Sequence, residues 1–140
     1  MGTMSTMEQA KGTFDVTIER EPPYDTSDGV TLGRMSITKQ FHGELSATSK
    51  VDMVAAGTPV PGSAGYVAIE RVVGTLQGRP GTFILQHSGS MNRGVPSLTV
   101  TVVPDSGTGG CKGLSGTMLI EIVDRQHFYT FDYTIHLDQV

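Results

Sequence analysis

Hydrophobic and polar residues alternate with a period of two along most of the chain, and this alternation is typical of half-buried β-strands. Glycine, proline and polar residues separate the alternating segments. The pattern predicts eight strands, over residues 10–20, 32–41, 44–56, 65–77, 81–92, 97–104, 111–122 and 127–138. Because most links are short, neighbouring strands should be antiparallel. We therefore expect an all-β fold, a single eight-stranded up-and-down barrel, since closure removes exposed sheet edges. A two-sheet sandwich is the main alternative.

Two predicted hairpins allow the strand register to be worked out. A turn at Asp124 and Arg125 places apolar, aromatic or glycine residues on one face, and the pairs are Leu114 with Ile135, Gly116 with Tyr133, Met118 with Phe131 and Ile120 with Tyr129. A one-residue slip would mix the two faces.

In the earlier hairpin, a turn centred on Arg79 and Pro80 would pair Leu76 with Phe83, Gly74 with Leu85, Val72 with His87 and Glu70 with Gly89.

The segment "YVAIERVVG", residues 66–74, carries two adjacent charges in the middle of an apolar strand. Successive side chains of a strand point to opposite faces, so one of Glu70 and Arg71 should face the interior. Ala68, Gly74 and Gly89 share the face of Glu70, as expected where side chains crowd or a ligand must fit. We therefore predict that Glu70 points inward and Arg71 points outward.

Length and composition limit the classes of protein that the chain can represent. A chain of 140 residues suggests one domain, and we assign residues 1–9 to a flexible N-terminal leader, in part of vector origin, and 10–140 to the barrel. The single cysteine excludes an internal disulfide, and no apolar run resembles a signal peptide or a membrane span. The ten Lys and Arg residues are scattered and the net charge is −4, which argues against nucleic acid. We expect a cytoplasmic protein with no membrane partner.

A family resemblance rests on several stretches that together span about residues 10–137. The stretches "ITKQFHGELSATS", "YVAIERVVGTLQGRPGTFILQHSG" and "VVPDSGTGGCKGLSG" resemble a bacterial family of uncharacterised domains with an allene oxide cyclase-like barrel. The matching positions are Tyr66, Ala68, Glu70, Gly78, Arg79, Gly81, Phe83, His87 and Ser106 to Gly109. Many relatives have a tryptophan in the first strand, and this chain has none. The resemblance implies the fold and assigns no activity.

A group of polar residues shares the predicted inner face. Lys39 alternates with apolar residues, so Lys39, Glu70 and His87 can meet inside the barrel, with Tyr66 or Tyr133 nearby. A buried carboxylate needs a cation, hydrogen-bond donors or a proton, and we predict that Glu70 is bonded to Lys39 or His87. We take Lys39, Tyr66, Glu70, His87 and Tyr133 as candidate ligand-binding residues. Glu70 and His87 are weak candidates for catalysis, and a purely structural ion pair is the competing interpretation.

Other motifs carry little chemistry. The loop "DSGTGGCKG" resembles a phosphate cradle but matches neither glycine-rich motif and precedes a strand, so we expect a flexible hairpin loop. The four histidines lack metal-ligand spacing, His136 and Asp138 share an outer face, and we expect no metal or cofactor. Cys111, beside Lys112 in that loop, lacks the setting of a catalytic nucleophile.

Three functions remain open, and the sequence does not decide whether the protein is an enzyme. The leading one is non-covalent binding of a small, largely apolar ligand in the lumen, which eight strands can just accommodate. The first alternative is an isomerase or cyclase acting on a flexible apolar substrate. The second is a barrel packed solid by Phe14, Phe83, Tyr129, Phe131 and Tyr133, acting through self-association. An outer patch of Val67, Ile69, Val73 and Ile84 would then support a homo-oligomer.

The state of the lumen and of Glu70 distinguishes these functions. A filled lumen would exclude binding and catalysis inside the barrel. An open lumen with its polar groups bonded to one another favours binding. An open lumen with an unpaired Glu70 of raised pKa favours catalysis.

Overall fold

The computed structural model describes residues 7–136 and contains nine β-strands and one 3₁₀ turn, η1, at Ser27–Gly29. The strands are β1 (Met7–Arg20), β2 (Thr31–Gly43), β3 (Leu45–Gly57), β4 (Ala64–Leu76), β5 (Arg79–Asn92), β6 (Val95–Val102), β7 (Thr108–Gly109), β8 (Leu114–Val123) and β9 (Gln126–Ile135). β1 begins three residues before its predicted start, so part of the expected leader belongs to the barrel wall. Residues 1–6 and 137–140 lie outside the described part.

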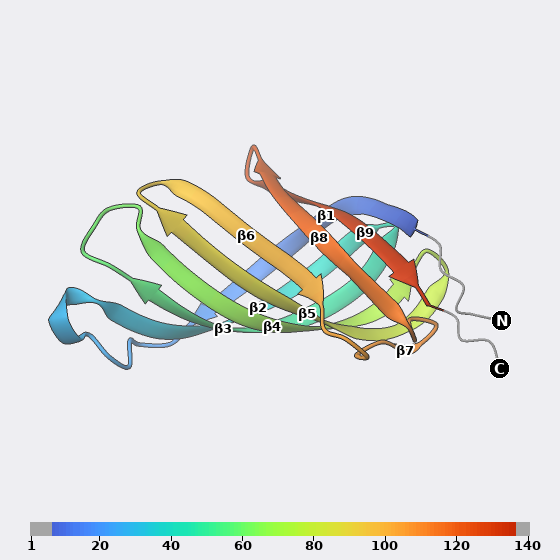
Figure 1. Cartoon of the computed structure of the whole chain (residues 1–140), viewed down its shortest axis with the longest axis horizontal. Coiled ribbons are helices and arrows are strands. Elements are labelled where there is room, and N and C mark those ends of the chain that lie inside the picture. Colours follow the sequence, from blue (N-terminus) through green and yellow to red (C-terminus); the bar gives the residue numbers. More distant parts are fainter. Residues whose placement is uncertain (1–6, 137–140) are drawn as a thin grey trace.

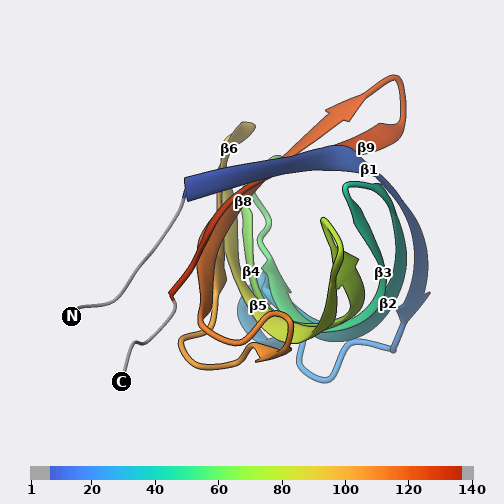
Figure 2. The same cartoon turned by 90° about the vertical axis from the view of Figure 1, so that its right-hand side faces the viewer.

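Eight of these strands form a closed antiparallel barrel (Figure 2). Each pairs with its neighbour in the order β1-β2-β3-β4-β5-β6-β8-β9, and β9 returns to β1. The barrel predicted from the alternating pattern is thereby confirmed over the sandwich. The two-residue strand β7, which the sequence did not predict, pairs with β5 at Gly81 and Thr82. No helix among residues 7–136 has the length and apolar character needed to cross a membrane.

The register of the β8–β9 hairpin is as predicted, with Gly116 opposite Tyr133 and Met118 opposite Phe131. The predicted β4–β5 register is wrong, because Glu70 pairs with Leu85, four residues from Gly89. The turn lies at Gln77 and Gly78, which both have positive φ angles, 43° and 84°. Proline cannot adopt a positive φ, so Pro80 belongs to the strand and not to this two-residue turn. The error is an even number of residues, and every side chain keeps its predicted face.

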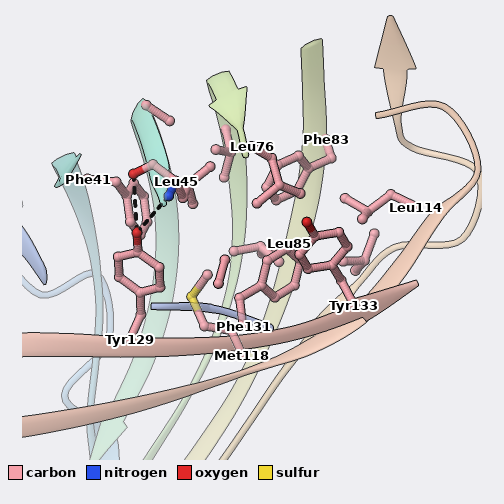
Figure 3. Close-up of a cluster of buried hydrophobic side chains, with 14 of the residues drawn as sticks. Phe41, Leu45, Leu76, Phe83, Leu85, Leu114, Met118, Tyr129, Phe131 and Tyr133 are labelled. Atoms are coloured by element: carbon pink, nitrogen blue, oxygen red, sulfur yellow. Dashed lines mark hydrogen bonds between the residues drawn. The ribbon is translucent and has the colours of Figure 1, made fainter. Parts of the chain in front are cut away.

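One end of the barrel is filled by a hydrophobic core (Figure 3). We call this end the packed half, and the turns after β2 and β4 lie there (Figure 1). The five aromatic residues predicted to fill the lumen are all buried. With Phe41 they form stacked, tilted and edge-to-face ring pairs whose centroids lie 5.2–5.8 Å apart. The core comprises Phe14, Phe41, Leu45, Leu76, Phe83, Leu85, Leu114, Met118, Tyr129, Phe131, Tyr133 and smaller neighbours. The lumen is thus solid at this end.

The inward glycines Gly74 and Gly116 lie where side chains crowd and do not leave the lumen open. A Cβ at Gly74 would lie 2.5 Å from Ala47, and one at Gly116 would lie 2.9 Å from Tyr133. Their missing side chains allow neighbouring residues to approach closely in the packed half. Open space arises elsewhere, at the opposite end of the barrel.

The barrel wall is incomplete at that opposite end, which we call the open half. β6 and β8 share one paired position, Thr101 with Thr117, and then diverge. β9 follows β1 only as far as Phe14, whereas β1 continues beside β2 to Arg20. The β8–β9 hairpin consequently projects away from the barrel (Figure 1). The open half is therefore walled mainly by β1 to β6.

Candidate functional site

Glu70 is the centre of a buried polar cluster, and its side chain is fully inaccessible to solvent. Its Oε1 accepts hydrogen bonds from Nζ of Lys39 at 3.1 Å and from Nε2 of His87 at 2.7 Å. Its Oε2 accepts a third hydrogen bond, from Oγ of Ser49 at 2.6 Å. Arg71 is exposed on the outer face. Both predictions, an inward Glu70 bonded to Lys39 or His87 and an outward Arg71, are confirmed.

Four consecutive strands supply one member each to this cluster. Lys39 on β2 pairs directly with Ser49 on β3, and Glu70 on β4 lies opposite Val51, two residues further along β3. His87 on β5 pairs with Ala68, two residues from Glu70 on β4. Residues two apart share a face, so the four side chains form a diagonal row across the inner wall. The small Ala68 leaves the space in which the side chains of Glu70 and His87 meet.

Glu70 is ionised although it is buried. Burial acts to raise the pKa of Glu70, but it is outweighed chiefly by the hydrogen bond from His87, the charge of Lys39 and the hydrogen bond from Ser49, in that order. The pKa of Glu70 is therefore held below its ordinary value. An ionised acceptor requires that Nε2 of His87 carries the proton of their hydrogen bond.

Aromatic rings complete the surroundings of Lys39. Its Nζ lies 4.7 Å from the ring centroid of Phe14 and 5.8 Å from that of Phe41. Cations are attracted to ring faces at such distances. The ammonium group thus has a carboxylate on one side and aromatic faces on others, which compensates for much of its lost hydration.

Beside this cluster the open half contains a cavity in two parts. The inner chamber has a volume of about 190 Å³ and is lined by Lys39, His87, Tyr66 and His127 among apolar residues, namely Phe14, Val16, Ile18, Ile37, Val51, Met53, Ile120 and Ile122. The outer part, which we call the mouth, has a volume of about 910 Å³. Met53, Tyr66 and Ile122 line both parts, so the chamber and the mouth are continuous.

Two nitrogen atoms of the cluster are available to a molecule in the chamber. Nδ1 of His87 makes no hydrogen bond with the described residues. Every buried side-chain nitrogen or oxygen in the described part has a partner, so Nδ1 must be in contact with open space. Nζ of Lys39 has three protons and makes one hydrogen bond within residues 7–136, to Glu70. Because both residues line the chamber, these nitrogens are hydrogen-bonding groups that the chamber wall offers to a bound molecule.

Tyr66 forms the neck between the chamber and the mouth. It pairs across the sheet with Gly89, and a Cβ at Gly89 would lie 2.4 Å from the tyrosine ring. Glycine at this position lets the ring pack directly over the backbone of β5. Burial raises the pKa of the Tyr66 hydroxyl, which is therefore neutral near pH 7.

Tyr133 is the predicted ligand-binding residue that lies away from the cavity. It is buried in the packed half, where its hydroxyl donates to Oε1 of Gln77 and accepts a hydrogen bond from Arg79 at 3.1 Å. Arg79 also forms an ion pair with Glu8 at 2.9 Å. Tyr133 therefore closes the packed end, whereas Lys39, Tyr66 and His87 line the cavity and Glu70 is buried behind Lys39 and His87.

Two residues of the site were missed in the sequence, Ser49 in the polar cluster and His127 in the chamber wall. Ser49 alternates with the buried Ala47 and Val51, so its inward position could have been recognised from the period-two pattern. His127 lines the chamber and its ring centroid lies 5.0 Å from that of Phe14. Its place beside the β8–β9 turn resembled a solvent-exposed hairpin end, and the sequence contained no signal for its contact with Phe14.

The glycine-rich loop, residues 103–113, folds back onto β5 and is not the free hairpin that we expected. The amide of Ile84 donates to Oγ of Ser106 at 3.1 Å, and the amide of Gly110 donates to the carbonyl of Pro80 at 2.7 Å. Cys111 is buried, and burial raises the pKa of its thiol, with the charge of Arg79 opposing this. A buried neutral thiol is a poor nucleophile.

The remaining sequence candidates are dispersed. Within residues 7–136, no group of three or more His, Cys, Asp or Glu side chains is placed to hold a metal ion. His136 is exposed beside Ser115, and Asp138 lies outside the described residues. On the predicted outer patch, Val67, Ile69 and Val73 are about half exposed and Ile84 is partly covered.

Comparison with known proteins places the chain in a family. Residues 10–133 match the family described as "Protein of unknown function (DUF3224)". The chain belongs to this family. A crystal structure of a DUF3224 protein of unknown function from Shewanella oneidensis MR-1 is 48% identical, with a TM-score of 0.87, and the match covers 96% of this chain and 100% of that one. Comparison with curated proteins gives no match. The family assignment supports the barrel and leaves the activity to be inferred from the site.

Proposed function

We propose that this DUF3224 protein binds a small, largely apolar molecule non-covalently in the open half of its barrel. The observation that carries the proposal is the continuous cavity, whose inner chamber has apolar walls and the polar nitrogens of Lys39 and His87 at its base. Apolar walls with a few convergent polar groups are the usual composition of small-molecule sites.

The pairing of Glu70 favours binding over acid–base catalysis. Both carboxylate oxygens accept hydrogen bonds, and the lowered pKa keeps the group ionised near pH 7. A general acid or base needs a pKa near the operating pH and direct contact with the reacting proton. Glu70 is instead suited to orient Lys39 and His87. An isomerase or cyclase remains the alternative, with Glu70 acting only through its charge.

The first experiment is native mass spectrometry of gently purified protein, followed by denaturing extraction. A reproducible extra mass of a few hundred daltons per chain would identify a bound molecule. In parallel, the neutral fluorophore N-phenyl-1-naphthylamine would be titrated into the protein, and we expect saturable enhancement of its emission.

A pair of variants distinguishes the lumen from the outer surface. Met53→Trp places a large ring at the junction of chamber and mouth, whereas the adjacent Val54 points outward and provides the matched control Val54→Trp. We expect Met53→Trp to weaken fluorophore binding by about tenfold or more, and Val54→Trp to bind as wild type. Equal binding by the two variants, or no saturable binding and no extra mass in the wild type, would refute the proposal.

A further inference from the structure

The polar groups at the base of the chamber define the chemistry of the ligand's head group. Nε2 of His87 carries a proton because it donates to the ionised Glu70, 2.7 Å away. In the neutral imidazole, Nδ1 is then an acceptor. Nζ of Lys39 bonds to the same Oε1 and is a donor. His87 and Lys39 therefore present one acceptor and one donor to the chamber, and both are held by the same carboxylate oxygen of Glu70.

The charge of the cluster favours a neutral head group. Lys39 and Glu70 compensate each other, so this buried ion pair carries no net charge. A carboxylate in the chamber would add an unbalanced charge between apolar walls, which is costly. A hydroxyl adds no charge, and it can donate to one group while accepting from the other.

The size and walls of the chamber favour a small ring. Its volume of about 190 Å³ compares with the cavity of roughly 150 Å³ that holds benzene in an engineered protein. Phe14, His127 and Tyr66 provide aromatic walls. Aromatic side chains pack well against another ring, either offset or edge to face. The larger mouth leaves space for a substituent on that ring.

We propose that the head group of the ligand is a ring hydroxyl of the phenol or enol type, which donates a hydrogen bond to Nδ1 of His87 and accepts one from Nζ of Lys39. This inference rests on the proposed function and specifies its ligand class. The ring occupies the inner chamber, and the rest of the molecule extends past Met53 and Tyr66 into the mouth. Glu70 and Ser49 contact no ligand and hold the two recognition groups in place.

Three probes with the same apolar body test the head group. They are 2-naphthol, its methyl ether 2-methoxynaphthalene, which cannot donate, and 2-naphthoate, which is anionic. Each would displace N-phenyl-1-naphthylamine from the wild-type protein, and we expect 2-naphthol to bind about tenfold more tightly than either of the others. Equal affinity of 2-naphthol and its ether, or tighter binding of 2-naphthoate, would overturn the inference while leaving the proposed function intact. Failure of all three probes and of the fluorophore would overturn both.

Variants on β5 test whether His87 causes the preference for 2-naphthol over its methyl ether. In His87→Gln the amide nitrogen can still donate to Glu70, but the acceptor at the Nδ1 position is lost. We expect the ratio of naphthol affinity to ether affinity to fall to about one in this variant, and to keep its wild-type value in the outward control Ser88→Ala. If His87→Gln does not fold, ¹⁵N spectra of histidine-labelled wild-type protein show whether the hydroxyl of 2-naphthol bonds to Nδ1 of His87. 2-Naphthol should shift the His87 Nδ1 resonance and the ether should not; equal shifts would contradict the assignment.

Discussion

Tyr66 packs its ring directly over the backbone of Gly89, its cross-strand partner on β5. Because a Cβ at Gly89 would lie 2.4 Å from that ring, we expect Gly89→Ala to displace Tyr66 and to reshape the neck of the cavity. The affinity for N-phenyl-1-naphthylamine should change severalfold. Gly33→Ala, also at the mouth and with no atom within 4 Å of the added Cβ, should bind as wild type.

The contact between Tyr66 and Gly89 also predicts that substitutions at the two positions have non-additive effects on probe affinity. Once Tyr66 is replaced by alanine, the substitution Gly89→Ala should have little further effect on probe affinity, because the ring that it displaces is gone. Additive effects in the double variant would show that Gly89 acts by another route.

Removal of Glu70 alone should be strongly destabilising. In Glu70→Leu the ammonium of Lys39 stays buried without its carboxylate, and we expect a loss of about 3–5 kcal/mol in the free energy of unfolding. The double variant Lys39→Met/Glu70→Leu should recover much of this loss, because a buried ion pair can be replaced by apolar residues. Urea unfolding followed by circular dichroism measures both. Arg71→Leu, on the outer face of the same strand, should change stability by no more than about 0.5 kcal/mol.

The lowered pKa of Glu70 predicts an acid-dependent contribution to stability. A carboxyl group whose pKa is lower in the folded state stabilises the protein above its unfolded pKa, which is near 4.5 for glutamate. That contribution is lost as the pH falls through the folded pKa. The stability difference between wild type and Glu70→Gln should therefore be largest near pH 6–7 and shrink as the pH is lowered below about 4.5. Urea unfolding at several pH values measures the difference, and a constant difference would contradict an ionised Glu70.

The Tyr129 hydroxyl should contribute measurably to the packed half. It accepts a hydrogen bond from the amide of Leu45 at 2.9 Å (Figure 3). It also donates to the carbonyl of His42 at 3.0 Å, beside the turn between β2 and β3. Tyr129→Phe leaves the buried Leu45 amide without this partner, and we expect a loss of about 1–3 kcal/mol in thermal or urea unfolding. Tyr24→Phe, at a half-exposed side chain, should be nearly neutral. Equal effects of the two would contradict a structural role for the buried hydroxyl.

The period-two pattern predicted the barrel and the inward face of Glu70 because alternation records burial directly. It did not predict the β4–β5 register, since Arg79 and Pro80 resembled a turn more strongly than Gln77 and Gly78, where the backbone turns. The alternating pattern also predicts which side chains point inward, but it does not predict where along the barrel axis each of them lies. Tyr133 and Tyr66 both point inward, yet one lies in the packed half and the other at the cavity. That distinction depends on the stagger of eight strands, which no single segment encodes.

Because the barrel is divided into a packed half and an open half, residues that determine folding and residues that line the cavity lie in different parts of the structure. Substitutions at the aromatic core affect whether the chain folds, and under the proposed function substitutions around Met53, Ile120 and Ile122 affect what the cavity accepts. The mouth can therefore diverge among relatives while the fold persists. The same separation makes the protein a convenient starting point for engineering, because new ligand preferences can be selected at the open half without redesigning the part that stabilises the barrel.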